Sequence, residues 1–260
     1  MKHVEAERRP ILEVQSLCLA FGGLQAVNDL SFEVEPGTIT SLIGGNGAGK
    51  TTAFNLIAGN YRADSGQILF KGQRIDGLPP HKIARAGIAR SFQELRLFNR
   101  LTAQDNILAA FPAQRGESLL FSLFGGAGLR AANRENETRS SALLEELTLG
   151  GHAGSLAEQL SYGQQKLLAL GRLLAAEGEL LLLDEPTSGL SPAMVDDFCE
   201  RILQLVKTGK TILLIEHNVD IVLRLSDWVV VMHQGSKIAE GLPDDVRHNV
   251  AVMETYLGLG

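Results

Sequence analysis

A glycine-rich loop followed by a lysine and two threonines is the part of the chain whose residue types point most directly to chemistry. The loop reads Gly44-Gly45-Asn46-Gly47-Ala48-Gly49-Lys50-Thr51-Thr52. Glycines let backbone N–H groups turn toward a bound anion, because no Cβ atom obstructs them. A lysine and a hydroxyl at these offsets suit the β- and γ-phosphates of a nucleotide and a Mg²⁺ ion. We therefore expect a phosphate-binding loop, with Lys50 on the phosphates and Thr51 on the metal.

The flanking residues supply the elements that such a loop needs. Residues 38–43 are short, apolar and β-branched, which predicts a buried strand, and residues 53–58 have helical spacing. The partial positive charge of a helix N-terminus would favour a phosphate at the loop. The alternative, a glycine-rich turn that only caps a helix, gives no reason for a Lys-Thr pair at this offset.

A second candidate group is a pair of carboxylates at the end of an apolar run. Residues 180–183 are four leucines, followed by Asp184, Glu185 and Pro186. We expect this strand to lie beside the strand of the phosphate-binding loop, with Asp184 supporting Mg²⁺. Glu185 would then polarise the attacking water, and a well-placed base accelerates a reaction by roughly 10²–10⁴-fold. The alternative is a turn with two solvated acids.

Composition narrows the classes of protein to consider. The formal net charge is −6, with 24 basic and 30 acidic side chains, which does not favour a nucleic-acid binder. Cys18 and Cys199 lack metal-ligand spacing, so we expect a reducing compartment and no disulfide. No signal peptide and no run of about 18 apolar residues is evident, so a membrane function would need another chain.

The order of predicted elements indicates an α/β fold. We expect a P-loop NTPase core, a mostly parallel sheet with flanking helices, together with an antiparallel β layer and a helical insert. The core would comprise residues 1–93 and 161–260, and the helical subdomain residues 94–160. Predicted strands cover 11–21, 30–34, 38–43, 67–70, 88–92, 180–184, 211–215, 228–232 and 237–240. Predicted helices cover 53–58, 130–147, 163–175 and 192–207, with shorter ones starting near Pro80 and Thr102.

A third motif, Leu160-Ser161-Tyr162-Gly163-Gln164-Gln165-Lys166, opens a predicted helix. Taken alone, Ser161 is an ordinary N-cap. The phosphate loop, this motif and the Asp-Glu strand come in an order that resembles the ATP-binding cassette (ABC) family. Its signature is usually Leu-Ser-Gly-Gly-Gln, so Tyr162 marks a variant. The resemblance runs from about Ile11 to Gly258, nearly the whole chain.

This resemblance implies roles for further residues. Phe21 would stack on the adenine of ATP, although a core position on its strand is the alternative. Gln93 would be a ligand of Mg²⁺ and water, and His217 would contact the γ-phosphate. Ser161, Gly163 and Gln164 would cover the ATP held by a second subunit, which implies a head-to-tail dimer. Ser191 replaces the usual Asp or Asn of the following loop, which puts communication across that dimer in doubt. Gly45 replaces a common Pro, which glycine's wider φ range should tolerate.

A finer resemblance points to the ATPases of branched-chain amino acid uptake. It is carried by Ser91-Phe92-Gln93-Glu94-Leu95-Arg96-Leu97-Phe98, Leu101-Thr102, Asn106, the signature Tyr162-Gly163-Gln164-Gln165, Ile215-Glu216-His217 and the ending Tyr256-Leu257-Gly258. It implies a peripheral ATPase subunit on the cytoplasmic face of the membrane. Its partners would be permease subunits, a paralogous ATPase chain and, indirectly, a solute-binding protein, with no nucleic acid. Relatives with this pattern also serve urea or amide uptake.

Two other hypotheses about the class of protein remain open at this point. A soluble ABC protein of DNA repair or translation would usually carry a long coiled-coil insert or two cassettes, and a P-loop kinase would not need the signature or His217. For the permease surface, Leu97 and Phe98 are the candidates. The apolar residues 119–124 are an alternative candidate, although packing within the insert is the better explanation for them.

Overall fold

Strands and helices alternate in the computed structural model, which describes residues 9–91, 95–112, 126–249 and 252. The strands are β1 (Leu12–Phe21), β2 (Leu24–Val34), β3 (Ile39–Gly44), β4 (Ser65–Phe70), β5 (Gln73–Arg74), β6 (Ile88–Arg90), β7 (Leu180–Asp184), β8 (Thr211–Ile215), β9 (Trp228–His233) and β10 (Ser236–Gly241). The helices are α1 (Lys50–Ile57), α2 (Pro80–Ala86), α3 (Ala103–Leu108), α5 (Gly126–Glu146), α6 (Tyr162–Ala175), α7 (Pro192–Lys207), α8 (Val219–Leu225) and α9 (Pro243–Arg247). The sequence predicts most of these elements, but not α8 and α9.

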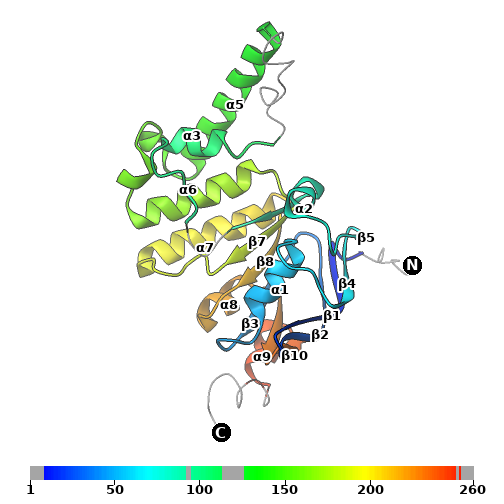
Figure 1. The fold of residues 1–260 in the computed structure, drawn as a ribbon. Helices are drawn as coiled ribbons and strands as arrows, with labels where there is room; N and C mark the ends of the chain where they lie inside the picture. Colours follow the sequence, from blue (N-terminus) through cyan, green and yellow to red (C-terminus); the bar gives the residue numbers. More distant parts are fainter. Residues whose placement is uncertain (1–8, 92–94, 113–125, 250–251, 253–260) are drawn as a thin grey trace, which may run out of the picture.

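The central sheet has the strand order β10-β9-β3-β8-β7-β6 (Figure 1). Neighbouring strands run parallel except β10, which is antiparallel to β9. This confirms the predicted mostly parallel sheet of a P-loop NTPase core. One detail of the prediction is wrong: β7 does not lie beside β3, because β8 is inserted between them. The carboxylates at the end of β7 are therefore one strand farther from the phosphate loop.

The leucines of β7 show why a continuous apolar run forms a central strand. Leu180 and Leu182 face a core that contains α1, whereas Leu181 and Leu183 face a core that contains α6 and α7. Both faces of this strand are thus covered by helices, as parallel sheets require. A third, smaller apolar cluster lies between the sheet and the helices α8 and α9.

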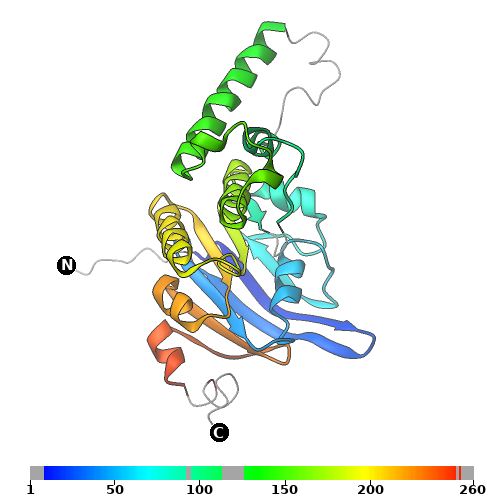
Figure 2. The same cartoon turned by 90° about the vertical axis from the view of Figure 1, so that its left-hand side faces the viewer.

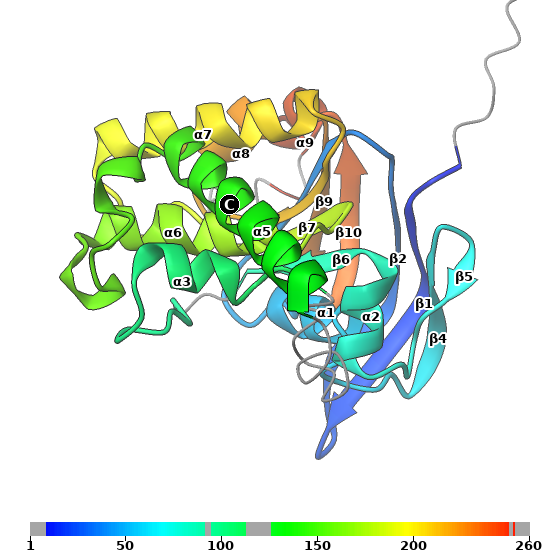
Figure 3. The ribbon, with the colours of Figure 1, turned by 90° about the horizontal axis from the view of Figure 1, so that it is seen from above.

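A separate antiparallel sheet has the order β2-β1-β4-β5 and packs on the core that contains α1. Figure 3 shows β1, β4 and β5 on the side of the molecule opposite α6 and α7. The predicted antiparallel layer and the small hairpin of β4 and β5 are confirmed, with β2 beginning at Leu24 instead of the expected residue 30.

The helices α3 and α5 pack against α6, and α5 extends away from the sheet (Figures 1 and 2). The N-terminus of α3 is capped as predicted, since the Thr102 side chain accepts a hydrogen bond from the backbone N–H of Asp105. The division into a core and a helical subdomain of residues 94–160 stays a prediction, because α6 belongs by sequence to the core but shares an apolar cluster with α3 and α5.

Several predicted features lie outside the described residues: Phe92, Gln93, Glu94, the apolar residues 119–124 and the ending Tyr256-Leu257-Gly258. Within the described ranges, no helix combines the length and apolarity that crossing a bilayer requires.

Candidate functional site

The phosphate loop connects β3 to α1, as the sequence predicts. Gly44, Gly47 and Gly49 have positive φ angles of 152°, 78° and 98°. A Cβ atom on Gly44 would collide with the backbone carbonyl of Met232, so glycine is required there sterically as well as conformationally. Gly45 has open space around its Cα and no positive φ, which agrees with its replacing a proline. The loop is braced from β9 and β10, since Gly235 N–H donates to the Ala48 carbonyl at 3.0 Å.

The Lys50 side chain lies buried across this loop. Its Nζ atom donates to the carbonyls of Gly44 and Gly45, at 2.9 Å each. Burial lowers the pKa of Lys50, and the opposing attraction of Glu185 and Asp184 shows that both carboxylates lie within electrostatic reach. Thr51, the next residue, is exposed, Thr52 is half-buried, and Asn46 is exposed. The residues predicted to contact phosphate and metal therefore lie together at the loop, and the Lys50 ammonium is buried there.

Asp184 ends β7 and is only 3% exposed. Burial raises the pKa of its carboxyl, and Arg90 opposes this effect with a guanidinium nitrogen 3.6 Å from the carboxylate. Burial also lowers the pKa of Arg90, which in addition donates a hydrogen bond to the Asn55 side chain of α1 at 2.6 Å. Arg90 thus ties the acidic end of β7 to the helix after the phosphate loop, a contact that the sequence did not indicate.

Glu185 and His217 lie at the ends of the neighbouring strands β7 and β8. Their side chains approach to 2.7 Å between Oε1 and Nε2. The pairing follows from the strand register, in which Asp184 lies opposite Ile215 and the Glu185 N–H donates to the Ile215 carbonyl at 2.9 Å. Glu185 has a φ of 46°, which is unfavourable for a residue with a Cβ atom. The structure therefore brings the two predicted catalytic residues together beside Asp184.

Glu216 is a site residue that sequence reasoning missed. It is buried, and its carboxylate accepts hydrogen bonds from the Thr187 hydroxyl and from the His217 backbone N–H, the latter at 3.0 Å. It thus connects the turn after β7 to the turn after β8. The signal that identified Asp184, an acid directly after a buried strand, applies equally to Glu216 at the end of β8.

The signature residues begin α6 and form a capping box. Ser161 accepts a hydrogen bond from the Gln164 N–H, and the Gln164 side chain accepts one from the Ser161 N–H at 2.9 Å. Gln164 also contacts His152 at 2.9 Å. Gly163 is buried beneath Met194, whose side chain would collide with any Cβ atom at that position. The capping interpretation of Ser161 is confirmed, and the other contacts of this motif are made with His152 and Met194.

Phe21 ends β1 and is 46% exposed. Its ring packs edge-to-face on Tyr61, with centroids 5.3 Å apart and planes at 74°. The alternative of a buried core position for Phe21 is therefore wrong, and an aromatic surface is presented instead. Tyr61 gave no sequence signal for this contact. Ser191 caps α7 by position only, since its side chain makes no capping hydrogen bond.

The substitution Thr187→Val tests the buried connection through Glu216. Removing the hydroxyl leaves the carboxylate with fewer donors, so we expect a loss of about 1–3 kcal/mol in the free energy of unfolding. Because the same carboxylate orients the His217 backbone, the rate of any reaction at this site should fall as well. Denaturant unfolding measures the first effect. Thr187→Ser, which keeps the hydroxyl, is the matched control, and equal stability of the Val and Ser variants would contradict the account.

Comparison with known proteins agrees with this geometry. The profile of the ABC transporter family matches residues 27–188. The chain is 43% identical to the high-affinity branched-chain amino acid transport ATP-binding protein BraF of Pseudomonas aeruginosa, over 96% of this chain and 98% of BraF. It is 41% identical to LivG of Escherichia coli, a protein of the same description, with the same coverage. The crystal structure of a nucleotide-free ATP-binding cassette superposes with a TM-score of 0.82 at 33% identity, covering 95% of this chain and 99% of that one. The chain belongs to the ABC transporter family, as one of its ATPases.

Proposed function

We propose that the chain is the ATPase subunit of an importer of branched-chain amino acids, and that it acts on separate permease subunits. The observation that carries the ATPase part is the Glu185–His217 contact of 2.7 Å, at the strand ends beside the buried Lys50. The transport part is supported by the relatives, since BraF and LivG are named as transport proteins. Urea or an amide is the alternative solute.

In this proposal the phosphate loop binds the triphosphate of ATP through backbone N–H groups and the Lys50 ammonium. The residues that would line it are Gly44, Asn46, Gly47, Ala48, Gly49, Lys50, Thr51 and Thr52. Phe21 stacks on the adenine. Glu185 accepts a proton from the water that attacks the γ-phosphorus, and His217 contacts the γ-phosphate. For this step Glu185 must exchange its contact with His217 for one with water.

The residues at the loop suit Mg²⁺, which takes oxygen ligands and usually binds through one or two carboxylates plus substrate phosphates. Asp184 offers a buried carboxylate and Thr51 an exposed hydroxyl. Within the described part of the chain, no three His, Cys, Asp or Glu side chains are grouped so that they could hold a metal ion by themselves, so phosphate oxygens would complete the ligand set. Thr51, Asp184 and Gln93 would hold the ion, which neutralises charge on the phosphates.

A second ATPase chain would complete the site. In this proposal Ser161, Gly163 and Gln164 cover the ATP of a partner subunit. Ser161 is exposed and is held by Gln164, which also contacts His152, while Gly163 lies beneath Met194. We propose a head-to-tail dimer, with a paralogous chain as the partner. An exposed Ser161 at a helix N-terminus would place positive backbone potential against the γ-phosphate.

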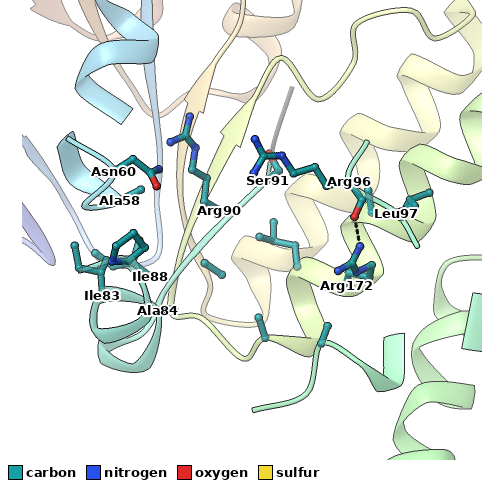
Figure 4. A pocket seen from close by; sticks show the side chains of 16 residues that line it. Ala58, Asn60, Ile83, Ala84, Ile88, Arg90, Ser91, Arg96, Leu97 and Arg172 are labelled. Carbon is teal, nitrogen blue, oxygen red and sulfur yellow. Dashed lines mark hydrogen bonds between the residues drawn. The ribbon is translucent and has the colours of Figure 1, made fainter. Parts of the chain in front are cut away.

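The permease would dock in a groove between the sheet and the α6 region (Figure 4). The groove has a volume of about 370 Å³, and Arg96, Leu97 and Arg172 line one wall of it. Arg172 donates a hydrogen bond to the Arg96 carbonyl. Phe98 lies beside the groove, 49% exposed, with the Arg172 guanidinium 4.6 Å from its ring centroid. The chain would then be peripheral, on the cytoplasmic face of the membrane, with the solute-binding protein acting only through the permease.

The backbone around Phe98 is fixed, although its ring is exposed. The fully buried Asn106 side chain accepts a hydrogen bond from the Phe98 N–H at 2.9 Å and donates one to the Phe98 carbonyl at 3.0 Å. A rigidly held, exposed aromatic ring is a common anchor in protein interfaces. This supports Phe98, with Leu97, as the contact for a permease helix.

The substitution Glu185→Gln tests the proposed chemistry. We expect ATP hydrolysis by the assembled transporter to fall by roughly 10²–10⁴-fold, because the amide cannot accept the proton. ATP binding should persist, so the dimer should accumulate and be visible by size-exclusion chromatography with ATP, Mg²⁺ and the cognate subunits. Glu200→Gln, an exposed glutamate of α7, is the matched control. A wild-type rate of ATP hydrolysis by the Glu185→Gln variant, or the presence of monomers alone under these conditions, would contradict the proposal.

The substitution Phe98→Glu tests the permease surface. The new carboxylate can pair with the neighbouring Arg172, so folding should be unaffected, whereas an apolar contact with the permease is lost. We expect uptake of labelled leucine to fall at least about tenfold, while basal ATPase is retained. Leu242→Glu, at a comparably exposed apolar residue before α9, serves as the control. Equal loss of uptake and basal ATPase would show that Phe98 acts within the cassette.

A further inference from the structure

The ammonium of Lys166 is a buried charge that none of the roles above explains. Lys166 lies on α6, one turn after Tyr162, and is 6% exposed. Its Nζ atom is 3.3 Å from the backbone carbonyl oxygen of Glu185, to which it donates, and 5.7 Å from the ring centroid of Tyr162. A buried ammonium is unfavourable unless its contacts compensate, so this arrangement demands an explanation.

The peptide that Lys166 contacts is itself in an unfavourable conformation. Glu185 has a φ of 46°, and such a conformation persists in a residue with a Cβ atom only where the surroundings fix it. Two donors converge on the Glu185 carbonyl, Lys166 Nζ and the N–H of Ser188, the latter at 3.2 Å. On the other side of the residue, the Glu185 N–H is held by Ile215.

The turn after Glu185 is covered from the same helix. The Tyr162 hydroxyl donates to the Ser188 carbonyl at 3.4 Å. A Cβ atom on Gly189 would come within 2.9 Å of the Tyr162 ring, so the turn passes directly beneath that ring. The start of α6 therefore contacts the turn at two carbonyls, with Lys166 on that of Glu185 and Tyr162 on that of Ser188.

We propose that Lys166 is a positioning residue, whose ammonium fixes the Glu185 peptide so that the carboxylate points toward the attacking water. This rests on the proposed role of Glu185 as the base. Burial lowers the pKa of Lys166, and the negative charges of Glu216, Glu185 and Asp184 oppose that effect. Lys166 touches neither water nor phosphate in this role; it acts through the main chain of Glu185.

The test is Lys166→Met in the assembled transporter, with steady-state and single-turnover hydrolysis of labelled ATP. We expect kcat to fall by about 10- to 100-fold. A displacement of the catalytic base by up to about 1 Å has an effect of this size on the rate. KM for ATP should stay within about twofold, because ground-state binding is untouched. The melting temperature is measured alongside, because removing the ammonium leaves the neighbouring carboxylates with less compensation and is expected to lower stability. Lys166→Gln is measured in parallel, and we expect the same changes in kcat and KM for it. It replaces the Met variant in the test if that variant does not fold.

The double variant with Glu185→Gln separates this role from any other. If Lys166 acts only through Glu185, adding Lys166→Met to Glu185→Gln lowers the residual single-turnover rate no further. Lys210→Met is the matched control, because Lys210 also donates to a backbone carbonyl, that of Gly178 at 2.7 Å, away from the site.

Three results would overturn the inference. They are a kcat of Lys166→Met near that of the wild type, a raised KM for ATP, or a fall in the single-turnover rate of the double variant, relative to Glu185→Gln, as large as the fall that Lys166→Met causes in the wild type. The proposed function would survive each of them. A wild-type rate for Glu185→Gln alone would instead contradict the proposed role of Glu185 as the base. Failure of the inference and failure of the proposed function are therefore distinguishable.

Discussion

The pairing of β7 with β8 is the constraint on which the rest of the site depends. The register that places Asp184 opposite Ile215 also places Glu185 and His217 at adjacent strand ends. A shift of one residue would turn each of these side chains to the other face of the sheet. Residues 180–183 are all leucines and both faces of β7 are buried, so the apolar run by itself fits either face. The register is defined instead by the ladder to β8, which the hydrogen bond from the Glu185 N–H to the Ile215 carbonyl continues up to the catalytic pair.

The site also concentrates charges that burial destabilises. The pKa values of Lys50 and Lys166 are lowered by burial, and that of Asp184 is raised. Each group keeps opposite charges nearby, which limits the penalty without removing it. Phosphates and their counterion would supply the charges that complete this set. We therefore expect nucleotide binding to relieve part of this electrostatic cost of the fold.

The sequence predicted the elements that carry the site more completely than the contacts between them. The phosphate loop, the leucines before Asp184 and the capped start of α6 are local patterns, so they could be found residue by residue. The position of β8 between β3 and β7 could not, because strand order depends on contacts between distant segments. For the same reason the roles of Arg90, Glu216 and Lys166 became visible only once three separate strand and helix ends were placed together.

The central claim is that Glu185 activates water at a site completed by a second subunit. The most direct measurement is a structure of the assembled transporter with Mg²⁺ and a non-hydrolysable ATP analogue. The account predicts that the carboxylate of Glu185 has left His217 and lies about 2.6–3.2 Å from a water in line with the γ-phosphorus. It also predicts that the signature serine of the opposite subunit faces that phosphate. A bound analogue with Glu185 still on His217 and no water near its carboxylate would contradict the account.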